Sequence, residues 1–138
     1  MRYFDASALA KRYVREKGSL KVRRLLASGL PATSRYSAVE IASALARRAR
    51  DGAISGADSE RALTALREDL AAMLVVELTP EVVTRAQTLL QRHSLRAGDA
   101  VQLASCLHLR NELEQPITLV VFDDRLAAAA RKEKVRLE

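Results

Sequence analysis

The sequence alternates short, strand-like apolar runs with longer helical segments along its whole length, and this alternation constrains the fold more than any other feature. The runs with strand character are residues 2–4, 31–34, 73–78 and 117–122, with a candidate edge strand at 135–137. The segments predicted to be helical are residues 7–14, 19–27, 37–50, 57–71, 80–93, 98–111 and 124–132. Strands separated by helices predict an α/β fold, a three-layer sandwich in which helices flank a mainly parallel central sheet.

The composition is that of a folded globular protein, and we expect residues 1–138 to form a single domain. Hydrophobic residues make up 49% of the chain and charged residues 29%. No apolar run approaches the ~20 residues that cross a bilayer, and the opening MRYFDASALAKRY lacks the apolar core of a signal peptide. We therefore expect a cytoplasmic protein with no membrane partner. The single cysteine, Cys106, excludes an intramolecular disulfide and is expected to be a small core residue.

Positive charge is concentrated in the first part of the chain. The formal net charge is +6, yet residues 1–50 hold twelve Lys and Arg against three acids, whereas residues 51–138 hold eleven against fourteen. Clustered Arg and Lys side chains predict a face that binds phosphate groups. This favours a nucleic-acid partner over a merely solvated surface.

Four acids stand at or near the points where predicted helices begin. Asp5 and Asp123 follow predicted strands, whereas Glu40 and Asp99 lie near the starts of predicted helices. In a parallel sheet the working site lies beyond the carboxyl ends of the strands, so the topology predicts that these side chains share one crevice. Gathered carboxylates raise one another's pKa values, and a hard cation removes that conflict. The sequence therefore predicts a Mg²⁺ site, in which Mn²⁺ can substitute.

Each acid also has a simpler interpretation, as a helix cap. The segment SAVE has the pattern of a capping box, with Ser37 at the N-cap and Glu40 three positions on. Of the adjacent pair, we expect Asp124 to cap the last helix and Asp123 to face the crevice, because adjacent residues leaving a strand point in different directions. If the acids only cap helices, the chain is a binding module and not an enzyme.

Side chains near these acids are candidates for support and for contacts with a nucleic-acid backbone. Ser7 lies two residues after Asp5, so its hydroxyl either supports the site, by holding the Asp5 carboxylate or a metal-bound water, or caps the first helix. Asp124 is a second candidate for support. The candidate cations for contacts with nucleic-acid phosphates are Lys11, Arg12, Arg15, Arg47 and Arg96, and the alternative for Arg47 is a solvated position.

Several common catalytic motifs are absent. The chain has no GxxxxGK[ST] or GxGxxG phosphate-binding loop and no GxSxG nucleophile motif. His93 and His108 are far apart in sequence and are expected to pack or to lie on the surface. Hydrolysis at this site would therefore depend on carboxylates alone.

Four segments together resemble VapC-type PIN-domain toxins. The opening MRYFDASALAKRYVREKGS resembles the family's first motif, in which a strand ends at an Asp followed by a small residue and Ser. TSRYSAVEIASALARR resembles the second motif, with Glu40 as its acid, and LRAGDAVQLAS the third, with Asp99. VVFDDRLAAAARKE resembles the fourth, in which an Asp, here Asp123, is followed by two residues and Leu126. The four motifs occur in the family's order and span the chain.

The resemblance implies the PIN fold and a Mg²⁺- or Mn²⁺-dependent endoribonuclease that is the toxin of a toxin–antitoxin pair. It also implies a homodimer and a small VapB-like antitoxin that lays a segment across the acidic pocket. The metal-binding and catalytic acids that it implies are Asp5, Glu40, Asp99 and Asp123.

Two positions depart from the family's pattern. Gln102 stands where the family often has His, at a position that does not bind metal. Phe122 stands where the family often has Thr or Ser, which alters the local support expected for Asp123.

The mechanism that we expect is hydrolysis of RNA by a metal-activated water, which leaves products with a 5′-phosphate. Asp5, Asp99 and Asp123 would bind one Mg²⁺ directly, and Glu40 would bind through water or to a second metal ion. One alternative is a non-catalytic nucleic-acid-binding or antitoxin-binding module in which the acids only cap helices. An aspartate-based phosphotransfer domain or phosphatase fits less well, because such sites usually need a Lys after a late strand, and ITLVVFDD supplies none.

Overall fold

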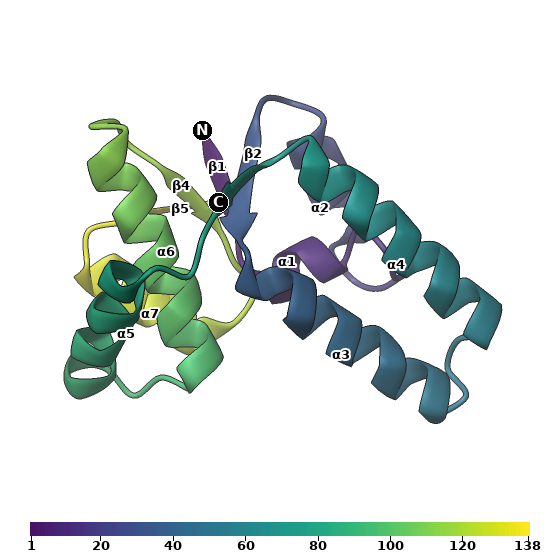
Figure 1. Ribbon diagram of the computed structural model, residues 1–138. Coiled ribbons are helices and arrows are strands. Elements are labelled where there is room, and N and C mark those ends of the chain that lie inside the picture. Colours follow the sequence, from purple (N-terminus) through teal and green to yellow (C-terminus); the bar gives the residue numbers. More distant parts are fainter.

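The computed structural model describes residues 1–138 and contains a five-stranded, all-parallel sheet between two layers of helices (Figure 1). The strands are β1 (Arg2–Phe4), β2 (Pro31–Ser34), β3 (Leu74–Val76), β4 (Thr118–Val120) and β5 (Arg136–Leu137). The helices are α1 (Ala6–Ala10), α2 (Ser19–Leu26), α3 (Tyr36–Arg50), α4 (Gly56–Ala71), α5 (Pro80–Arg92), α6 (Ala97–Glu112) and α7 (Asp124–Lys132). The predicted α/β sandwich with a parallel sheet is therefore confirmed.

The order of the strands in the sheet is β3-β2-β1-β4-β5. Strand β1 lies at the centre, where Tyr3 is in register with Ala32 of β2 and with Leu119 of β4. The chain adds β2 and β3 on one side of β1 and then crosses over to add β4 and β5 on the other. The direction of winding thus reverses between β1 and β4, and ligands of open α/β sheets bind beyond the carboxyl ends of strands at such a point.

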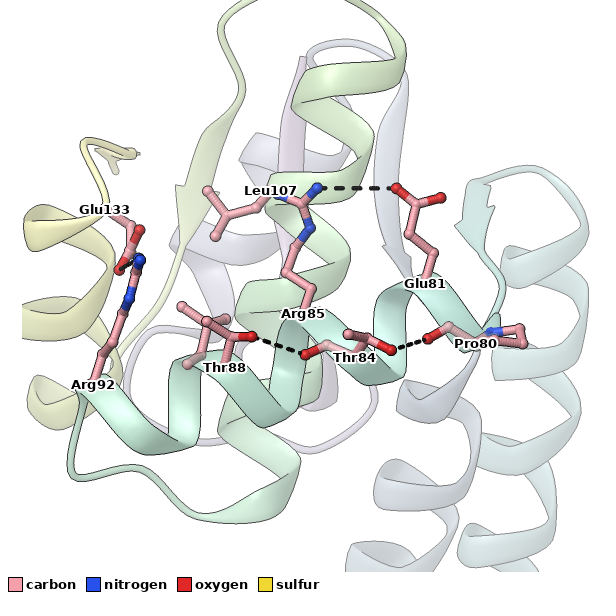
Figure 2. A pocket seen from close by; sticks show the side chains of 9 residues that line it. Pro80, Glu81, Thr84, Arg85, Thr88, Arg92, Leu107 and Glu133 are labelled. Carbon is pink, nitrogen blue, oxygen red and sulfur yellow. Dashed lines mark hydrogen bonds and ion pairs between the residues drawn. The ribbon is translucent and has the colours of Figure 1, made fainter.

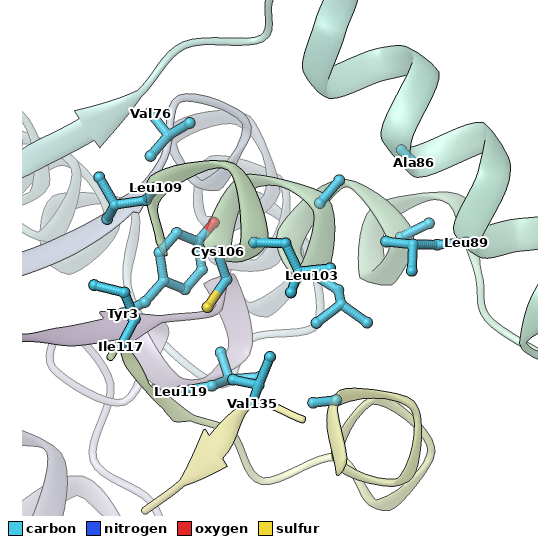
Figure 3. Packing of buried hydrophobic residues seen from close by; sticks show 14 of the residues in the cluster. Tyr3, Val76, Ala86, Leu89, Leu103, Cys106, Leu109, Ile117, Leu119 and Val135 are labelled. Carbon is cyan, nitrogen blue, oxygen red and sulfur yellow. The ribbon is translucent and has the colours of Figure 1, made fainter. Parts of the chain in front are cut away.

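The core consists of two apolar clusters, one on each face of the sheet, because successive side chains of a strand point to opposite faces. Tyr3 and Leu119 pack with α5, α6 and α7, whereas Phe4 and Val120 pack with α1 to α4. Figure 3 shows the first cluster, in which α6 lies over β1 and β4. Each fully buried leucine in it contributes about 1.5–3 kcal/mol of hydrophobic stabilisation.

Cys106 lies within this first cluster and is fully buried, as expected (Figure 3). Burial raises the pKa of its thiol to about 12. The thiol therefore stays protonated at neutral pH and has no nucleophilic role.

Most predicted helices agree with the structure to within a residue or two at each end, and α5 also has its expected cap. Thr79 accepts a hydrogen bond from the Val82 backbone N–H at 3.3 Å, and Pro80 is in the first turn. The Thr79 side chain thus pairs with a backbone N–H group that the helix leaves without a partner. Proline fits the first turn because it has no N–H group that would need one. No helix of the structure combines the length and the apolar character that crossing a membrane requires.

The first helix is shorter than predicted and ends at Ala10 instead of Val14. Beyond Ala10 the chain forms tight turns, in which the Tyr13 N–H donates to the Ala10 carbonyl at 2.9 Å. The Ser19 hydroxyl then donates to the Val14 carbonyl at 2.9 Å. These bonds turn Val14 back into the core, where it is buried, and this burial outweighs the helical tendency of the segment.

Candidate active site

Asp5 is the innermost of the four acids and lies at the carboxyl end of the central strand. Its Oδ1 accepts a hydrogen bond from the Ala8 N–H at 2.9 Å, which caps α1, and its Oδ2 accepts one from the Ser7 hydroxyl at 2.7 Å. Ser7 therefore holds the Asp5 carboxylate, one of the two roles predicted for it, and does not cap the helix. Asp5 is only 3% exposed. Burial, together with the charges of Glu40 and Asp99, raises the pKa of Asp5 to about 6, although both hydrogen bonds oppose this.

Glu40 is held by a buried glutamine of α6. The Gln102 Nε2 donates to Glu40 Oε2 at 2.7 Å and to the Ser37 hydroxyl at 3.0 Å, while its Oε1 accepts from the Tyr3 hydroxyl at 2.9 Å. Burial and the charge of Asp99 raise the pKa of Glu40. Gly98 lies against the other carboxylate oxygen, because a Cβ atom at position 98 would be 2.5 Å from Glu40 Oε1.

The capping box predicted at residues 37–40 is wrong. Helix α3 begins at Tyr36, and Ser37 lies inside its first turn. The Ser37 hydroxyl is 2.7 Å from the Thr33 hydroxyl and does not bond a free N–H group of the helix. A buried polar partner in the sheet thus replaces the local capping pattern, and Glu40 is left available to the crevice.

Asp99 lies in the first turn of α6. Its Oδ2 accepts a hydrogen bond from the Arg96 backbone N–H at 3.3 Å. Burial and the charge of Asp123 raise the pKa of Asp99, whereas the positive charges of Arg96 and Arg125 lower it. Both arginines therefore lie on the rim of the site, and Arg125 is a cation that the sequence analysis did not single out.

The roles expected for the adjacent acids Asp123 and Asp124 are partly wrong. Asp123 is the N-cap of α7, because its Oδ1 accepts a hydrogen bond from the Leu126 N–H at 2.7 Å. Asp124 is the first residue of the helix and is exposed, so it is not the cap. Asp123 therefore caps the helix with Oδ1, while its Oδ2 accepts no hydrogen bond from the protein and stays available to a ligand.

The four acids share one electrostatic environment. The charges of Glu40 and Asp99 act on Asp5, the charge of Asp99 acts on Glu40, and the charge of Asp123 acts on Asp99. They come from elements far apart in sequence, at the sheet edge where β1 and β4 end. Each of these charges raises the pKa of the acid on which it acts. This is expected where negative charges lie together without enough positive charge near them.

The donor set of this crevice fits a hard divalent cation. No three of the His, Cys, Asp and Glu side chains stand close enough together to form a ready-made metal site. The donors are nevertheless all carboxylates, and three of them keep one oxygen free of protein donors, since Glu40, Asp99 and Asp123 each use only one oxygen in hydrogen bonding. Oxygen donors with excess negative charge are those that Mg²⁺ and Mn²⁺ prefer.

Two of the predicted RNA-contact cations lie beside the crevice. The Lys11 ammonium is 3.2 Å from Glu16 Oε1 and 4.7 Å from the centroid of the Phe122 ring. Arg47 is exposed and, with Ser7, lines a cavity of about 270 Å³ between α1 and α3. Because Ser7 contacts Asp5, this cavity opens next to the innermost acid.

The other predicted cations are placed differently. Arg12 pairs with Asp69 at 3.4 Å and lines a cavity near Pro31, at the amino end of β2 and away from the acids. Arg15 is exposed and makes no hydrogen bond or ion pair. Arg96 lies at the rim, where its charge acts on Asp99.

The largest of the main cavities is not at the acids. It has a volume of about 540 Å³ and lies along α5, facing α6 and α7 (Figure 2). Its arginines are already paired with acids, Arg85 with Glu81 at 4.0 Å and Arg92 with Glu133 at 3.7 Å. The cavity therefore holds no excess charge and no set of gathered acids, and the crevice remains the candidate active site.

Both histidines, for which the sequence predicted packing or surface positions, lie against acids outside the crevice. The His93 Nε2 is 2.7 Å from Glu133 Oε1, and His108 Nδ1 is 3.6 Å from Glu81 Oε1. Neither histidine contacts any of the four crevice acids, so chemistry at the crevice involves carboxylates and not imidazoles.

Comparisons with known proteins agree with this arrangement. The family model of the PIN domain matches residues 2–132. This chain belongs to the PIN-domain family. Ribonuclease VapC45 and Ribonuclease VapC49, both of Mycobacterium tuberculosis, are each 34% identical to this PIN domain over 137 residues, which cover 98% of this chain and 92% of theirs. The resemblance to VapC-type proteins is thereby confirmed.

Solved structures share the fold of this PIN domain. Mycobacterium tuberculosis VapC20, a sarcin–ricin loop cleaving toxin, has a TM-score of 0.70 at 21% identity and covers 94% of this chain and 95% of its own. A toxin–antitoxin complex from Klebsiella pneumoniae has a TM-score of 0.67 at 17% identity, with coverage of 92% and 91%. VapBC2 from Rickettsia felis, bound to a DNA fragment from the promoter, has a TM-score of 0.67 at 13% identity, with coverage of 100% and 98%.

Proposed function

We propose that this PIN domain is a divalent-metal-dependent endoribonuclease that acts in the cytoplasm as the toxin of a toxin–antitoxin pair. The observation on which the proposal depends is the group of four carboxylates in the crevice, where burial and the charges of neighbouring acids raise the pKa values of Asp5, Glu40 and Asp99. The relatives that are 34% identical are named ribonucleases, which supports RNA as the substrate.

In this proposal Asp5, Glu40, Asp99 and Asp123 hold Mg²⁺ or Mn²⁺. When bound, such a cation supplies positive charge that activates water for in-line attack on a phosphodiester and stabilises the anionic transition state. The oxygens of Glu40, Asp99 and Asp123 that lack protein donors are the natural contacts.

The surrounding residues keep these acids in place. Ser7 and the Ala8 N–H orient Asp5, Gln102 orients Glu40, and the Leu126 N–H orients Asp123. Fixed donors of this kind hold the carboxylates before substrate arrives, so little reorganisation is needed during the reaction. Arg96 and Arg125 at the rim supply positive charge toward an approaching RNA backbone.

The proposed partners are supported by the solved structures that share this fold. Several structural neighbours are toxin–antitoxin complexes, which supports a small VapB-like antitoxin as partner. We propose that residues 1–138 act as one PIN-like domain, that two copies form a homodimer, and that the antitoxin covers the acidic crevice.

A second candidate, a binding module in which the acids only cap helices, is favoured by the backbone bonds of Asp5, Asp99 and Asp123. Glu40 argues against it, because its carboxylate accepts from the Gln102 side chain and caps nothing. Calorimetric titration of the antitoxin-free protein with Mn²⁺ distinguishes the two. If the acids form a metal site, the binding of Mn²⁺ should give a heat signal that saturates. If they only cap helices, the titration should show no binding.

The direct test of the proposed activity is RNA cleavage in vitro and in cells. We expect wild-type protein with Mg²⁺ or Mn²⁺ to cut RNA into fragments with 5′-phosphates, and sequencing of the 5′ ends after brief expression identifies the target. Asp99→Asn should abolish cleavage while the circular dichroism spectrum stays that of wild type. Undiminished metal-dependent cleavage by this variant would contradict the proposal.

The pair Asp123 and Asp124 supplies a matched comparison. Asp123→Asn keeps an oxygen that accepts from Leu126, so α7 stays capped while the negative charge is lost; we expect a large loss of cleavage with little loss of stability. Asp123→Ala should lose cleavage and, in addition, about 1 kcal/mol of stability with the cap. Asp124→Asn is the control and should cleave as wild type does. Equal losses for the two Asn variants would show that Asp124 shares the function.

A further inference from the structure

Phe122 is an exposed aromatic residue immediately before the crevice acid Asp123. The chain has only two phenylalanines, and the other, Phe4, is completely buried. Phe122 is 41% exposed and stands two residues beyond the end of β4, at the carboxyl edge of the sheet. A large apolar ring therefore faces solvent beside the candidate catalytic group.

The ring of Phe122 is held in place and is not simply left on the surface. Gly18, at the start of α2, lies so close that a Cβ atom there would be 2.8 Å from the Cε1 atom of the ring. Gly18 also has φ +95°, a backbone conformation that side chains disfavour, so glycine serves both the turn and the contact. The Lys11 ammonium lies 4.7 Å from the ring centroid, within the range of a cation–π interaction.

These contacts give the ring a defined position while 41% of the residue stays exposed. Lys11 is itself anchored by its ion pair with Glu16, and its side chain is only 14% exposed. An aromatic ring with a fixed position and an open surface loses little conformational freedom when a planar group stacks on it. Glu16 also pairs with Arg48 at 2.9 Å, so these two cations and one acid keep a net positive charge near the ring, which attracts a group that also carries phosphate.

From these observations we propose that Phe122 is a nucleobase-stacking residue, which binds an unpaired base of single-stranded RNA next to the phosphate at the crevice. Stacking on an aromatic ring accepts any base and needs the base to be unpaired. The inference rests on the proposed ribonuclease function and adds to it a preference for single-stranded substrate at this position.

A fluorescence measurement tests the stacking directly. The chain contains no tryptophan, so the variant Phe122→Trp has a single indole at the proposed contact. With EDTA present to prevent cleavage, we expect a short oligoadenylate to quench about half or more of the indole emission, because the base lies on the ring. Inorganic polyphosphate, which has the charge of a backbone but no bases, should not quench it.

A binding measurement on the otherwise unmodified chain supplies the second test. By fluorescence anisotropy of labelled oligoadenylate in EDTA, Phe122→Ala should bind about 5- to 100-fold more weakly than wild type. Phe122→Leu keeps the apolar bulk without the aromatic face and should also bind weakly, whereas Phe122→Tyr should bind within about 3-fold of wild type.

The matched control is Leu113→Ala. Leu113 is exposed to a similar extent, 37%, but follows the far end of α6, about 20 Å along the helix axis from Asp99. Its removal should leave the RNA affinity unchanged, which separates a specific contact from general surface hydrophobicity.

The outcomes separate this inference from the proposed function. Saturating RNA binding without quenching in Phe122→Trp, or wild-type affinity in both Phe122→Ala and Phe122→Leu, overturns the stacking role alone. A loss of antitoxin binding in Phe122→Ala with unchanged RNA affinity also overturns it, because the ring is then a protein contact. If wild-type protein neither binds nor cleaves RNA, the proposed function and the stacking role are both wrong.

Discussion

At the scale of single residues, the orientation of each acid depends on a partner distant in sequence. The acids Asp5, Glu40, Asp99 and Asp123 were all singled out by their place in the sequence, and the Ser7 bond to Asp5 was one of two predicted possibilities. The role of Gln102 was missed, since it stands 62 residues after Glu40 and has no local pattern. Its local signal was a polar amide in the apolar run AVQLASCLHL, where a buried amide must find partners, and it also stands where the family often has His.

Replacing Gln102 by leucine should separate the positioning of Glu40 from general stability. Gln102→Leu leaves the buried Tyr3 hydroxyl without its acceptor, which should cost about 1–3 kcal/mol in urea unfolding. It also frees Glu40, so we expect RNA cleavage to fall about 10-fold or more. The control is Ser105→Ala, which removes a buried hydroxyl of the same helix that bonds Ser34 and none of the acids. Cleavage by Gln102→Leu equal to that of the control would refute the positioning role.

At the scale of elements, the starts of four of the helices, α1, α3, α6 and α7, bring the four acids to the same edge of the sheet. The existence and order of the helices were predictable, because apolar spacing and Gly or Pro breaks mark them locally. The caps of α3 and α7 were not, since Ser37 turns to a partner in the sheet and Asp123 takes the position expected for Asp124. A local pattern offers several caps, and tertiary contacts choose among them.

The first turn of α6 gives a prediction in which stability and activity change differently. Gly98→Ala places a Cβ atom 2.5 Å from Glu40 Oε1, which is too close, so the carboxylate must shift. We expect cleavage to fall about 10- to 100-fold, while the free energy of unfolding stays within about 1 kcal/mol of wild type because alanine favours the helix. The control is Gly56→Ala at the start of α4, where a Cβ atom meets nothing within 4 Å. Equal cleavage by both variants would show that Gly98 does not set the position of Glu40.

At the scale of the whole molecule, the buried negative charge of Asp5 lowers the stability of the folded chain. The pKa of Asp5 is raised from 3.8 to about 6, chiefly by burial. Below about pH 4 the group is protonated in both the folded and the unfolded chain, and it has no effect. Between about pH 4 and 6 the unfolded chain has released a proton that the folded chain keeps, so stability falls as the pH rises. Above about pH 6 the cost is complete, on the order of 3 kcal/mol.

This cost predicts that an inactive variant is more stable than wild type. Asp5→Asn keeps an acceptor for the Ala8 N–H and removes the charge. In urea unfolding with EDTA, its advantage should grow from near zero at about pH 4 to about 2–3 kcal/mol at about pH 7. Mn²⁺ should stabilise wild type but not the variant. A variant no more stable than wild type at neutral pH would show that the buried charge of Asp5 is not destabilising.

The sequence by itself determined the succession of strands and helices along the chain, the parallel α/β class and the family, and it singled out the four acids as candidates, because apolar periodicity and short motifs are local properties of the chain. Only the tertiary structure decided which donor holds each carboxylate and which acid caps α7. It also decided that the Phe122 ring lies against Gly18 and close to the ammonium of Lys11. These contacts join groups that are far apart in sequence and that the fold brings together. A buried polar group must form hydrogen bonds, and its partners are the groups that the packing places beside it.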